Sequence, residues 1–378
     1  MPAAQKPQDA ARIQSLDGLR AVSILLVIYG HARVTYGFPG ADPAESPLAR
    51  LDVAHFGVKV FFVISGFLIT SLLIGELRKT GTVSLGAFYL KRTFRIFPPY
   101  YFYLLVALGI SALGMGELPW SDALLAFTYT INYSHDRAWL VGHAWSLSIE
   151  EQFYLVWPAV FRGLGTKKGP AAVLWVMALA PLLRVGWAYF VETKAGRDMI
   201  DEAFPTVADS IGTGCALALF RPRLHASERY LKVLASPVVP ALAVGMIWLA
   251  LWLDMRHAWV QWAIGETGLN LTIAILVDRY VRYPDGPVGR VLNFRPVAFI
   301  GMVSYSLYLW QQPFLRGIEA GKVPPWWQQF PVNVGLSFVV AVGSYYLIEK
   351  PFLRLRGRVM GEGKRAKEGQ LQARGFTS

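Results

Sequence analysis

The sequence of 378 residues has little charge and a single cysteine. Asp, Glu, Lys and Arg make up 16% of the chain, whereas hydrophobic residues make up 54%. Soluble proteins carry about 25% charged residues, because their domains need charge to wet their surfaces. Cys215 alone forms no intrachain disulfide. These shortages exclude a soluble enzyme, a disordered chain and a disulfide scaffold, and the excess apolar surface must face lipid.

Several motifs of soluble enzymes are also missing. The sequence has no phosphate-binding P-loop and no dinucleotide-binding glycine fingerprint. Ser65 lacks the leading glycine of the G-x-S-x-G hydrolase motif, because Val63 stands there. His135 and His143 are eight residues apart, which is not a standard zinc spacing. We therefore expect no metal cofactor.

Basic residues outnumber acidic ones by 37 to 25, which gives a net charge of +12. Membrane proteins keep Lys and Arg in their cytoplasmic loops, so this excess indicates orientation and does not require nucleic acid as a partner. The mean hydropathy of +0.37 favours the membrane interpretation. A polar start followed by an apolar run without a cleavage site predicts an uncleaved first span.

Apolar segments long enough to cross a bilayer define the expected topology, since a crossing helix needs about 20 residues. The candidates are 16–36, 55–75, 99–115, 143–161, 169–190, 205–220, 236–253, 259–278, 297–316 and 326–348, with 117–133 marginal. If 117–133 does not cross, 27 of the 37 basic residues fall on one side and 8 on the other. The sequence therefore predicts an all-α, polytopic membrane bundle of about ten helices with both termini cytoplasmic.

Three regions follow from this topology. Residues 1–15 form a cytoplasmic N-terminal segment, and residues 16–352 form one membrane-embedded domain. Residues 353–378 are a basic cytoplasmic tail that we expect to be disordered and attracted to anionic lipid headgroups. We expect a cell-membrane protein, and its oligomeric state, including a homodimer, stays open.

The first predicted helix carries Asp17, Arg20 and His31. Arg20 and His31 are eleven residues apart, or three helical turns, so they share one face. Ionisable groups inside a span are costly and usually functional. The alternatives are a snorkelling lipid anchor for Arg20 and a histidine merely hydrogen-bonded between helices for His31.

Two adjacent carboxylates, Glu150 and Glu151, open the fourth predicted helix. Both are costly when charged in apolar surroundings, which suits proton transfer. Ser146 and Tyr154 lie four residues before and after Glu150, on the same face. We expect Glu150 about 10 Å below the outer surface, at a depth where it can pair with His31. A polar clamp between helices is the alternative.

A basic cluster precedes the third span. Lys91, Arg92 and Arg95 lie on an expected interfacial helix that Pro98 and Pro99 end. A guanidinium pair there can clamp phosphates bidentately, and ordinary headgroup anchoring is the alternative. Two further basic residues lie inside predicted spans and need acidic partners. Two acids are candidates, but the sequence does not show which acid pairs with which base. The cations are Lys59 and Arg184, and the acids are Asp209 and Glu266.

Six segments of the chain form a recognisable series: 16–20 with His31, 61–69, Arg92-x-x-Arg95, 145–154, 304–310 and 348–352. Taken in order, these motifs resemble the acyltransferase-3 family of multi-pass membrane O-acyltransferases. The resemblance runs from Leu16 to Phe352.

The resemblance implies an acyl-CoA donor, most often acetyl-CoA, on the cytoplasmic side and a glycan or lipid-linked saccharide hydroxyl as acceptor. It implies that Arg20 and His31 form the essential first-helix pair, and that Arg92 and Arg95 help to hold the donor. Many members carry histidine where this sequence has Gln311. The sequence shows no appended extracytoplasmic esterase-like domain, so we expect the membrane domain or a separate partner to complete transfer.

A mechanism follows as a hypothesis. His31, oriented by Glu150, is the general base on the acceptor hydroxyl or a transient acyl carrier. Glu151 belongs to the same catalytic group, Lys91 joins the donor-binding arginines, and Arg20 or a tyrosine stabilises the oxyanion. Two alternatives stay open: acylation of an intracellular small molecule such as a macrolide, and a proton-coupled transporter, which also places His and Glu in a membrane interior.

Overall fold

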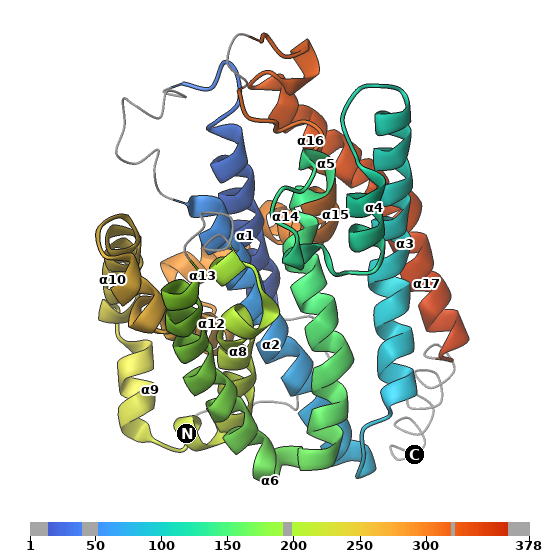
Figure 1. Ribbon diagram of the computed structural model, residues 1–378. Helices are drawn as coiled ribbons and strands as arrows, with labels where there is room; N and C mark the ends of the chain where they lie inside the picture. Colours follow the sequence, from blue (N-terminus) through green and yellow to red (C-terminus); the bar gives the residue numbers. More distant parts are fainter. Residues whose placement is uncertain (1–13, 40–51, 192–198, 319–321, 362–378) are drawn as a thin grey trace.

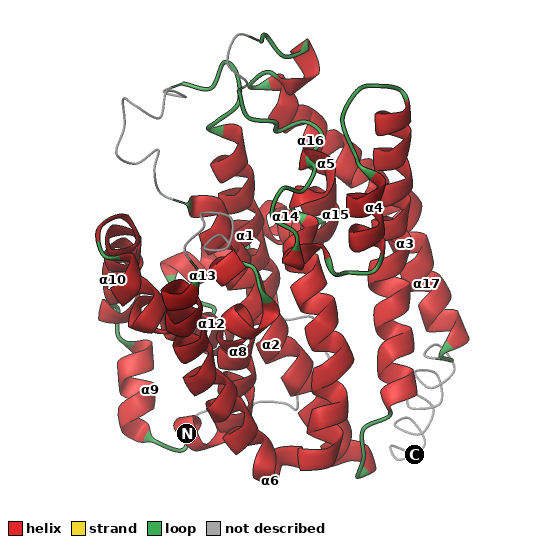
Figure 2. Ribbon diagram, viewed as in Figure 1, coloured by secondary structure: helices red, strands yellow, loops and turns green. Residues whose placement is uncertain are grey.

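A computed structural model describes residues 14–39, 52–191, 199–318 and 322–361, and within these ranges the chain forms helices and loops without strands (Figure 2). The α-helices are α1 (Gln14–Ala32), α2 (Val53–Thr80), α3 (Leu85–Ala112), α4 (Trp120–Phe127), α5 (Trp139–Gly142), α6 (Ala144–Phe190), α8 (Phe204–His225), α9 (Glu228–Ala235), α10 (Val238–Arg256), α11 (Ala258–Val260), α12 (Glu266–Arg282), α13 (Pro287–Leu292), α14 (Arg295–Met302), α15 (Ser304–Trp310), α16 (Val332–Ser344) and α17 (Lys350–Val359). The prediction of an all-helical protein is confirmed for this part of the chain.

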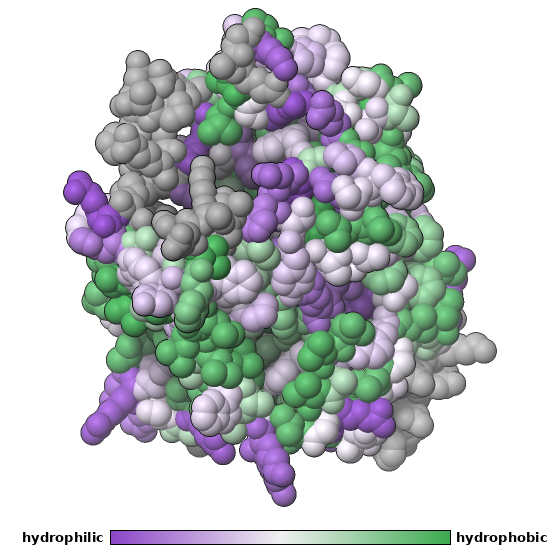
Figure 3. Space-filling model, in the orientation of Figure 1, coloured by the Kyte–Doolittle hydropathy of each residue, from purple (hydrophilic) through white to green (hydrophobic). Residues whose placement is uncertain are grey.

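Six helices in the described ranges are long and apolar enough to cross a membrane, or seven if the bent pair α9 and α10 forms one span. The protein is therefore a multi-pass membrane protein, and the predicted count of ten and the cytoplasmic termini stay predictions. Figure 3 shows apolar residues over the flanks and hydrophilic residues gathered toward the top and along the bottom edge.

Helix α6 covers two of the predicted spans, 169–190 in full and 143–161 from its second residue onward. A straight helix of its 47 residues would be about 70 Å long, more than twice the thickness of the hydrocarbon core. Gly165 has a left-handed φ of 56°, which glycine adopts without a steric penalty. Figure 1 shows that α6 descends, turns at the bottom of the view and rises again. The basic residues Arg162, Lys167 and Lys168 flank this turn.

The structure corrects the expected end of the basic helix before the third span. Pro98 and Pro99 do not end it, because α3 continues through both to Ala112. A membrane helix tolerates such prolines where neighbouring groups bind the nearby carbonyls. Pro98 and Pro99 remove the intrahelical donors to the carbonyls of Phe94 and Arg95. The Tyr305 hydroxyl donates a hydrogen bond of 3.0 Å to the next carbonyl, that of Ile96.

Two other segments differ from expectation at their ends. The candidate span 297–316 is two short helices, α14 and α15, which meet at Val303. The tail predicted from residue 353 begins as helix, because α17 runs to Val359. Residues 1–13 of the N-terminal segment and 362–378 of the tail lie outside the described residues. In the marginal segment 117–133, α4 has eight residues, too few for one helix to cross a bilayer.

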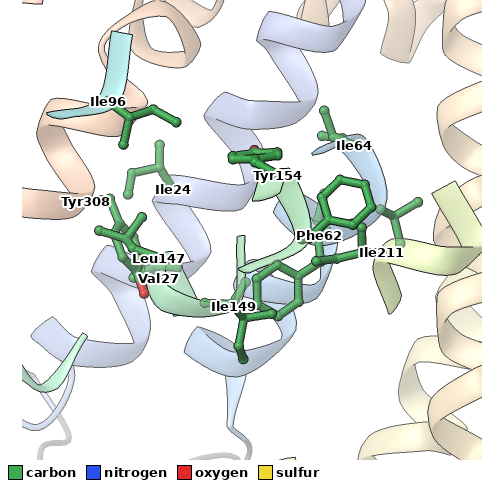
Figure 4. Packing of buried hydrophobic residues seen from close by; sticks show 14 of the residues in the cluster. Ile24, Val27, Phe62, Ile64, Ile96, Leu147, Ile149, Tyr154, Ile211 and Tyr308 are labelled. Carbon is green, nitrogen blue, oxygen red and sulfur yellow. The ribbon is translucent and has the colours of Figure 1, made fainter. Parts of the chain in front are cut away.

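Helices α2 and α8 pack closely against each other at the centre of the bundle. A Cβ on Gly66 would lie 2.0 Å from the Ile211 carbonyl oxygen, and one on Gly214 would lie 2.0 Å from that of Val63. Only glycine permits this approach, as is common where membrane helices cross. The crossing holds Ser65, next to Gly66, at the core side of α2. Figure 4 shows part of this core, to which α1, α2, α6, α8 and α15 contribute side chains.

Helix α1 runs upward in Figure 1 and α17 runs downward, so both ends of the described chain point to the same side.

Candidate active site

The predicted ionic residues of three helices meet at one cavity of about 80 Å³, which we call the arginine cavity. Arg20 comes from α1, Arg92 and Arg95 come from α3, and Glu150 and Glu151 come from α6. The other residues used below that line it are Val58, Ser65, Ser146, Tyr154 and Tyr308. The spacing of Arg92 and Arg95 along α3 turns both side chains toward this cavity.

The carboxylate of Glu150 is held by two hydroxyl donors. Ser65 donates to one oxygen at 2.6 Å, and Tyr154, one turn along α6, donates to the other at 3.2 Å. The Arg92 guanidinium lies 4.5 Å from the centre of the Tyr154 ring, a cation–π contact. One buried oxygen of Glu151 has no hydrogen-bond partner among the described residues. The predicted shared face of Glu150 and Tyr154 is therefore present.

Two further predicted residues differ in their position: Arg20 lines the arginine cavity, whereas Lys91 does not. Arg20 lies 3.9 Å from Asp17, so the expected pair one turn apart in the first helix is present. Lys91 is exposed and does not line the arginine cavity, so the structure does not bring it together with Arg92 and Arg95.

His31 lines a different cavity of about 350 Å³, which we call the histidine cavity because His55, His135 and His143 line it as well. The Nδ1 atom of His31 lies 2.7 Å from the Oε1 atom of Gln311. The Gln311 amide is oriented in turn, since its Nε2 atom donates to Gln312. An amide oxygen only accepts hydrogen bonds, so Nδ1 carries the proton and Nε2 keeps its lone pair.

The expected pairing of His31 with Glu150 is wrong. The two residues line separate cavities, which share only Val58 and Tyr308. Glu150 stands at the level of Arg20, and eleven residues of helix place His31 about 16 Å further along α1. The sequence-based depth of Glu150, counted from the start of the fourth predicted helix, therefore placed it at the level of His31, whereas it lies at the level of Arg20.

His143 is a residue that the sequence analysis did not select. It is 4% exposed, and neither ring nitrogen has a hydrogen-bond partner in the part of the chain that the structure describes. Each buried polar group left unpaired costs about 1–3 kcal/mol. The ring packs edge-on against Tyr103 with centres 5.3 Å apart. The sequence feature that could have identified His143 is its position at the start of the motif that contains Glu150.

The two other buried cations have the partners that the sequence left unassigned. Lys59 pairs with Glu266, between α2 and α12. Arg184 binds both oxygens of Asp209, at 2.8 and 2.9 Å. Arg184 also donates to the carbonyls of Thr206 and Trp262. Within each pair the acid and the base neutralise each other's charge, so we interpret both ion pairs as links between helices. No group of three metal-ligating side chains occurs among the described residues.

The fold and the two cavities define a multi-pass membrane protein with buried arginine and histidine sites, and the comparisons identify its family. A family model described as an acyltransferase domain matches residues 13–349. The chain belongs to the acyltransferase-3 family, as its motifs indicated. No solved structure matches the chain.

Three curated relatives have similar sequences. The chain is 29% identical to peptidoglycan O-acetyltransferase OatA of Listeria monocytogenes over 90% of its length and 55% of the relative's. It is 27% identical to O-acetyltransferase OatA of Staphylococcus aureus, covering 91% of the chain and 58% of the relative. It is also 27% identical to the putative peptidoglycan O-acetyltransferase YrhL of Bacillus subtilis, covering 93% and 56%. The chain thus spans little more than half the length of these relatives.

Proposed function

We propose that this protein is a membrane O-acyltransferase that moves an acetyl group from acetyl-CoA on the cytoplasmic side to a hydroxyl of a cell-wall glycan. The observation that carries the proposal is the pair of adjacent cavities, one rich in arginine and one containing His31. The names of the relatives support peptidoglycan as the acceptor and acetyl as the group transferred.

The arginine cavity is the donor site in this proposal. CoA is a polyanion, and guanidinium groups bind phosphates bidentately while staying charged. Arg92 and Arg95 hold the phosphates at the mouth, with Lys91 outside the cavity adding long-range attraction. Arg20 lies about 16 Å from His31 along α1, so we assign it to donor binding and not to the oxyanion. Glu150 and Glu151 balance the arginine charge and orient Arg92.

His31 performs the transfer chemistry. Its Nε2 lone pair accepts the proton of the acceptor hydroxyl while the hydroxyl oxygen bonds to the thioester carbonyl carbon. The carbon–sulfur bond then breaks, and the thiolate takes the proton from His31, so the imidazole is restored. Gln311 positions the imidazole by holding Nδ1–H. The thioester reaches His31 from the arginine cavity past Val58 and Tyr308, the residues common to both cavities.

The test is an assay in proteoliposomes with acetyl-CoA and soluble peptidoglycan fragments. We expect free CoA thiol to appear in proportion to acetylated fragment, as measured by a thiol reagent and by mass spectrometry. Movement of a substrate across the bilayer without thiol release would indicate a proton-coupled carrier instead. Acetylation of a macrolide but not of any saccharide would indicate the intracellular small-molecule acceptor. Mass spectrometry of cell walls with and without the gene then identifies the acyl group.

A further inference from the structure

A third cavity, of about 540 Å³, adjoins the histidine cavity and shares Arg137 and Trp139 with it. We call it the tryptophan cavity, because Trp139 and Trp327 both line it. Its other lining residues are apolar in the majority, and the polar ones among them include Glu117, Asp136 and Gln328. It lies where the end of α3, helix α5 and the segments on either side of residues 319–321 come together.

We propose that the acceptor saccharide binds across the tryptophan and histidine cavities, with the ring nitrogens of His143 hydrogen-bonded to the sugar that is acylated. This inference rests on the proposed function, because it names where the acceptor of that reaction lies. It assigns His143 and Trp327, which sequence reasoning did not select, to acceptor binding.

His143 carries the first part of the argument. A neutral imidazole has one donor and one acceptor, and both ring nitrogens of His143 are buried and unpartnered within the described ranges. Buried polar groups in proteins are nearly always hydrogen-bonded, so the partners must come from the contents of the cavity. A sugar offers hydroxyl groups that both donate and accept. The ring itself is fixed, since it packs against Tyr103 and Tyr308.

The sizes of the cavities give the second part. The arginine cavity has about 80 Å³ and admits only a narrow chain, whereas the histidine and tryptophan cavities have about 350 and 540 Å³. Pockets for compact small molecules span about 300–1,000 Å³. A saccharide therefore fits in the two larger cavities and not beside Arg20.

The side chains of the tryptophan cavity give the third part. Indole rings offer flat apolar faces for the C–H faces of a sugar, while carboxylates and amides bind its hydroxyls. The indole N–H of Trp139 is bonded to the carbonyl of Gln312 at 2.7 Å, which fixes this ring between the two cavities. The chain thus places an aromatic wall next to His31, with polar groups further out.

The test measures steady-state kinetics of the full chain in proteoliposomes, with acetyl-CoA and a soluble peptidoglycan disaccharide as probes. We expect His143→Phe to raise KM for the disaccharide about tenfold or more, because two hydrogen bonds are lost. His143→Gln, which keeps a donor and an acceptor, is expected to retain part of the affinity. KM for acetyl-CoA should stay within about twofold in both variants.

A matched control exists for each of the two tested positions, Trp327 and His143. Trp327→Ala is expected to raise KM for the disaccharide about fivefold to tenfold, on the scale of an aromatic contact. Trp326→Ala, at the exposed neighbouring position that lines neither cavity, should leave KM unchanged. His257→Phe is the control for His143, because His257 is exposed and lines none of the three cavities.

The outcomes separate this inference from the proposed function. If the wild-type protein acetylates the disaccharide but His143→Phe, His143→Gln and Trp327→Ala leave its KM unchanged, the acceptor site lies elsewhere while the function stands. If the His143 variants raise KM for acetyl-CoA instead, the histidine cavity binds the donor. If the wild-type protein acetylates no saccharide, the proposed function itself fails.

Discussion

The arginine cavity and the histidine cavity share the wall residues Val58 and Tyr308, yet their side chains are organised differently. In the arginine cavity, Glu150 accepts two hydrogen bonds and Arg92 stacks on Tyr154, and one oxygen of Glu151 lacks a hydrogen-bond partner among the described residues. In the histidine cavity, the ring nitrogens of His143 and, by its tautomer, Nε2 of His31 are left for a ligand.

In the proposed function, this difference corresponds to two tasks. A guanidinium is charged at every physiological pH, so the arginine cavity presents a permanent cationic surface to an anion. An imidazole exchanges protons near neutral pH and both donates and accepts, so the histidine cavity suits a hydroxyl whose proton must leave. Substitutions in the two cavities should therefore change different kinetic constants, and the predictions below test this separation.

The largest effect is expected for His31→Gln. Loss of a general base lowers a rate by about 10²–10⁴-fold, and we expect this loss in kcat with KM for acetyl-CoA unchanged. The measurement is CoA thiol release with the disaccharide acceptor, at equal amounts of membrane-inserted protein. His257→Gln, outside the cavities, should behave as wild type. Near-normal transfer by His31→Gln would refute the role of His31.

The next largest effect is expected for Arg92→Ala and Arg95→Ala. Each removes a charge-assisted contact of about 1.5–3 kcal/mol, so KM for acetyl-CoA should rise about 10–100-fold while KM for the disaccharide is unchanged. Arg92→Lys keeps the charge but loses the stacking on Tyr154 and the bidentate geometry, and should be intermediate. Lys91→Ala should raise this KM by no more than about twofold, since Lys91 is exposed outside the cavity and solvent and salt screen its attraction. An equal change in both KM values would contradict the division of tasks.

The residues that these predictions use differ in how far the sequence identified them. Regular helix geometry related Glu150 to Tyr154, and the structure contains that contact. Helix spacing also put Arg92 and Arg95 on one face, although the helix was expected to end at Pro98 and Pro99. A pattern read along one helix is reliable because 3.6 residues per turn fix it, whereas tolerance of a proline depends on neighbouring helices.

Relations between helices were harder to predict. The depth of Glu150 relative to His31 depends on where α6 starts against α1, and the sequence contains no measure of that offset. The partners of Lys59 and Arg184 were named only as a set of two acids, since choosing between them requires the packing of α2, α6, α8 and α12. His143 lay in a recognised motif, but its orphaned nitrogens become visible only when the surrounding side chains are placed.

A smaller effect is expected for Gln311→Leu. The amide of Gln311 fixes the tautomer of His31, so its loss should lower kcat about tenfold, the value of one positioning hydrogen bond. Gln311→His supplies an acceptor nitrogen and is the residue that many family members carry, so it should restore most of the rate. Both KM values should stay near wild type. Failure of Gln311→His to exceed Gln311→Leu would mean that Gln311 has a packing role only.

The smallest effect is expected at the shared wall, for Tyr308→Phe. The hydroxyl of Tyr308 bonds to Ser146 and to the carbonyl of His143, and it reaches neither His31 nor Glu150 by a hydrogen bond. Its removal leaves the ring between the cavities, so transfer should fall by no more than about threefold to fivefold.

Tyr308→Ala removes the ring as well and joins the two cavities. Water from the histidine cavity then also reaches a thioester that has stayed in the arginine cavity, so hydrolysis of acetyl-CoA without acceptor should rise above the wild-type rate, whereas Tyr308→Phe should not raise it. The measurement is thiol release in the absence of disaccharide. If both variants hydrolyse acetyl-CoA at the wild-type rate, Tyr308 does not separate donor from acceptor, and the two cavities act as one site.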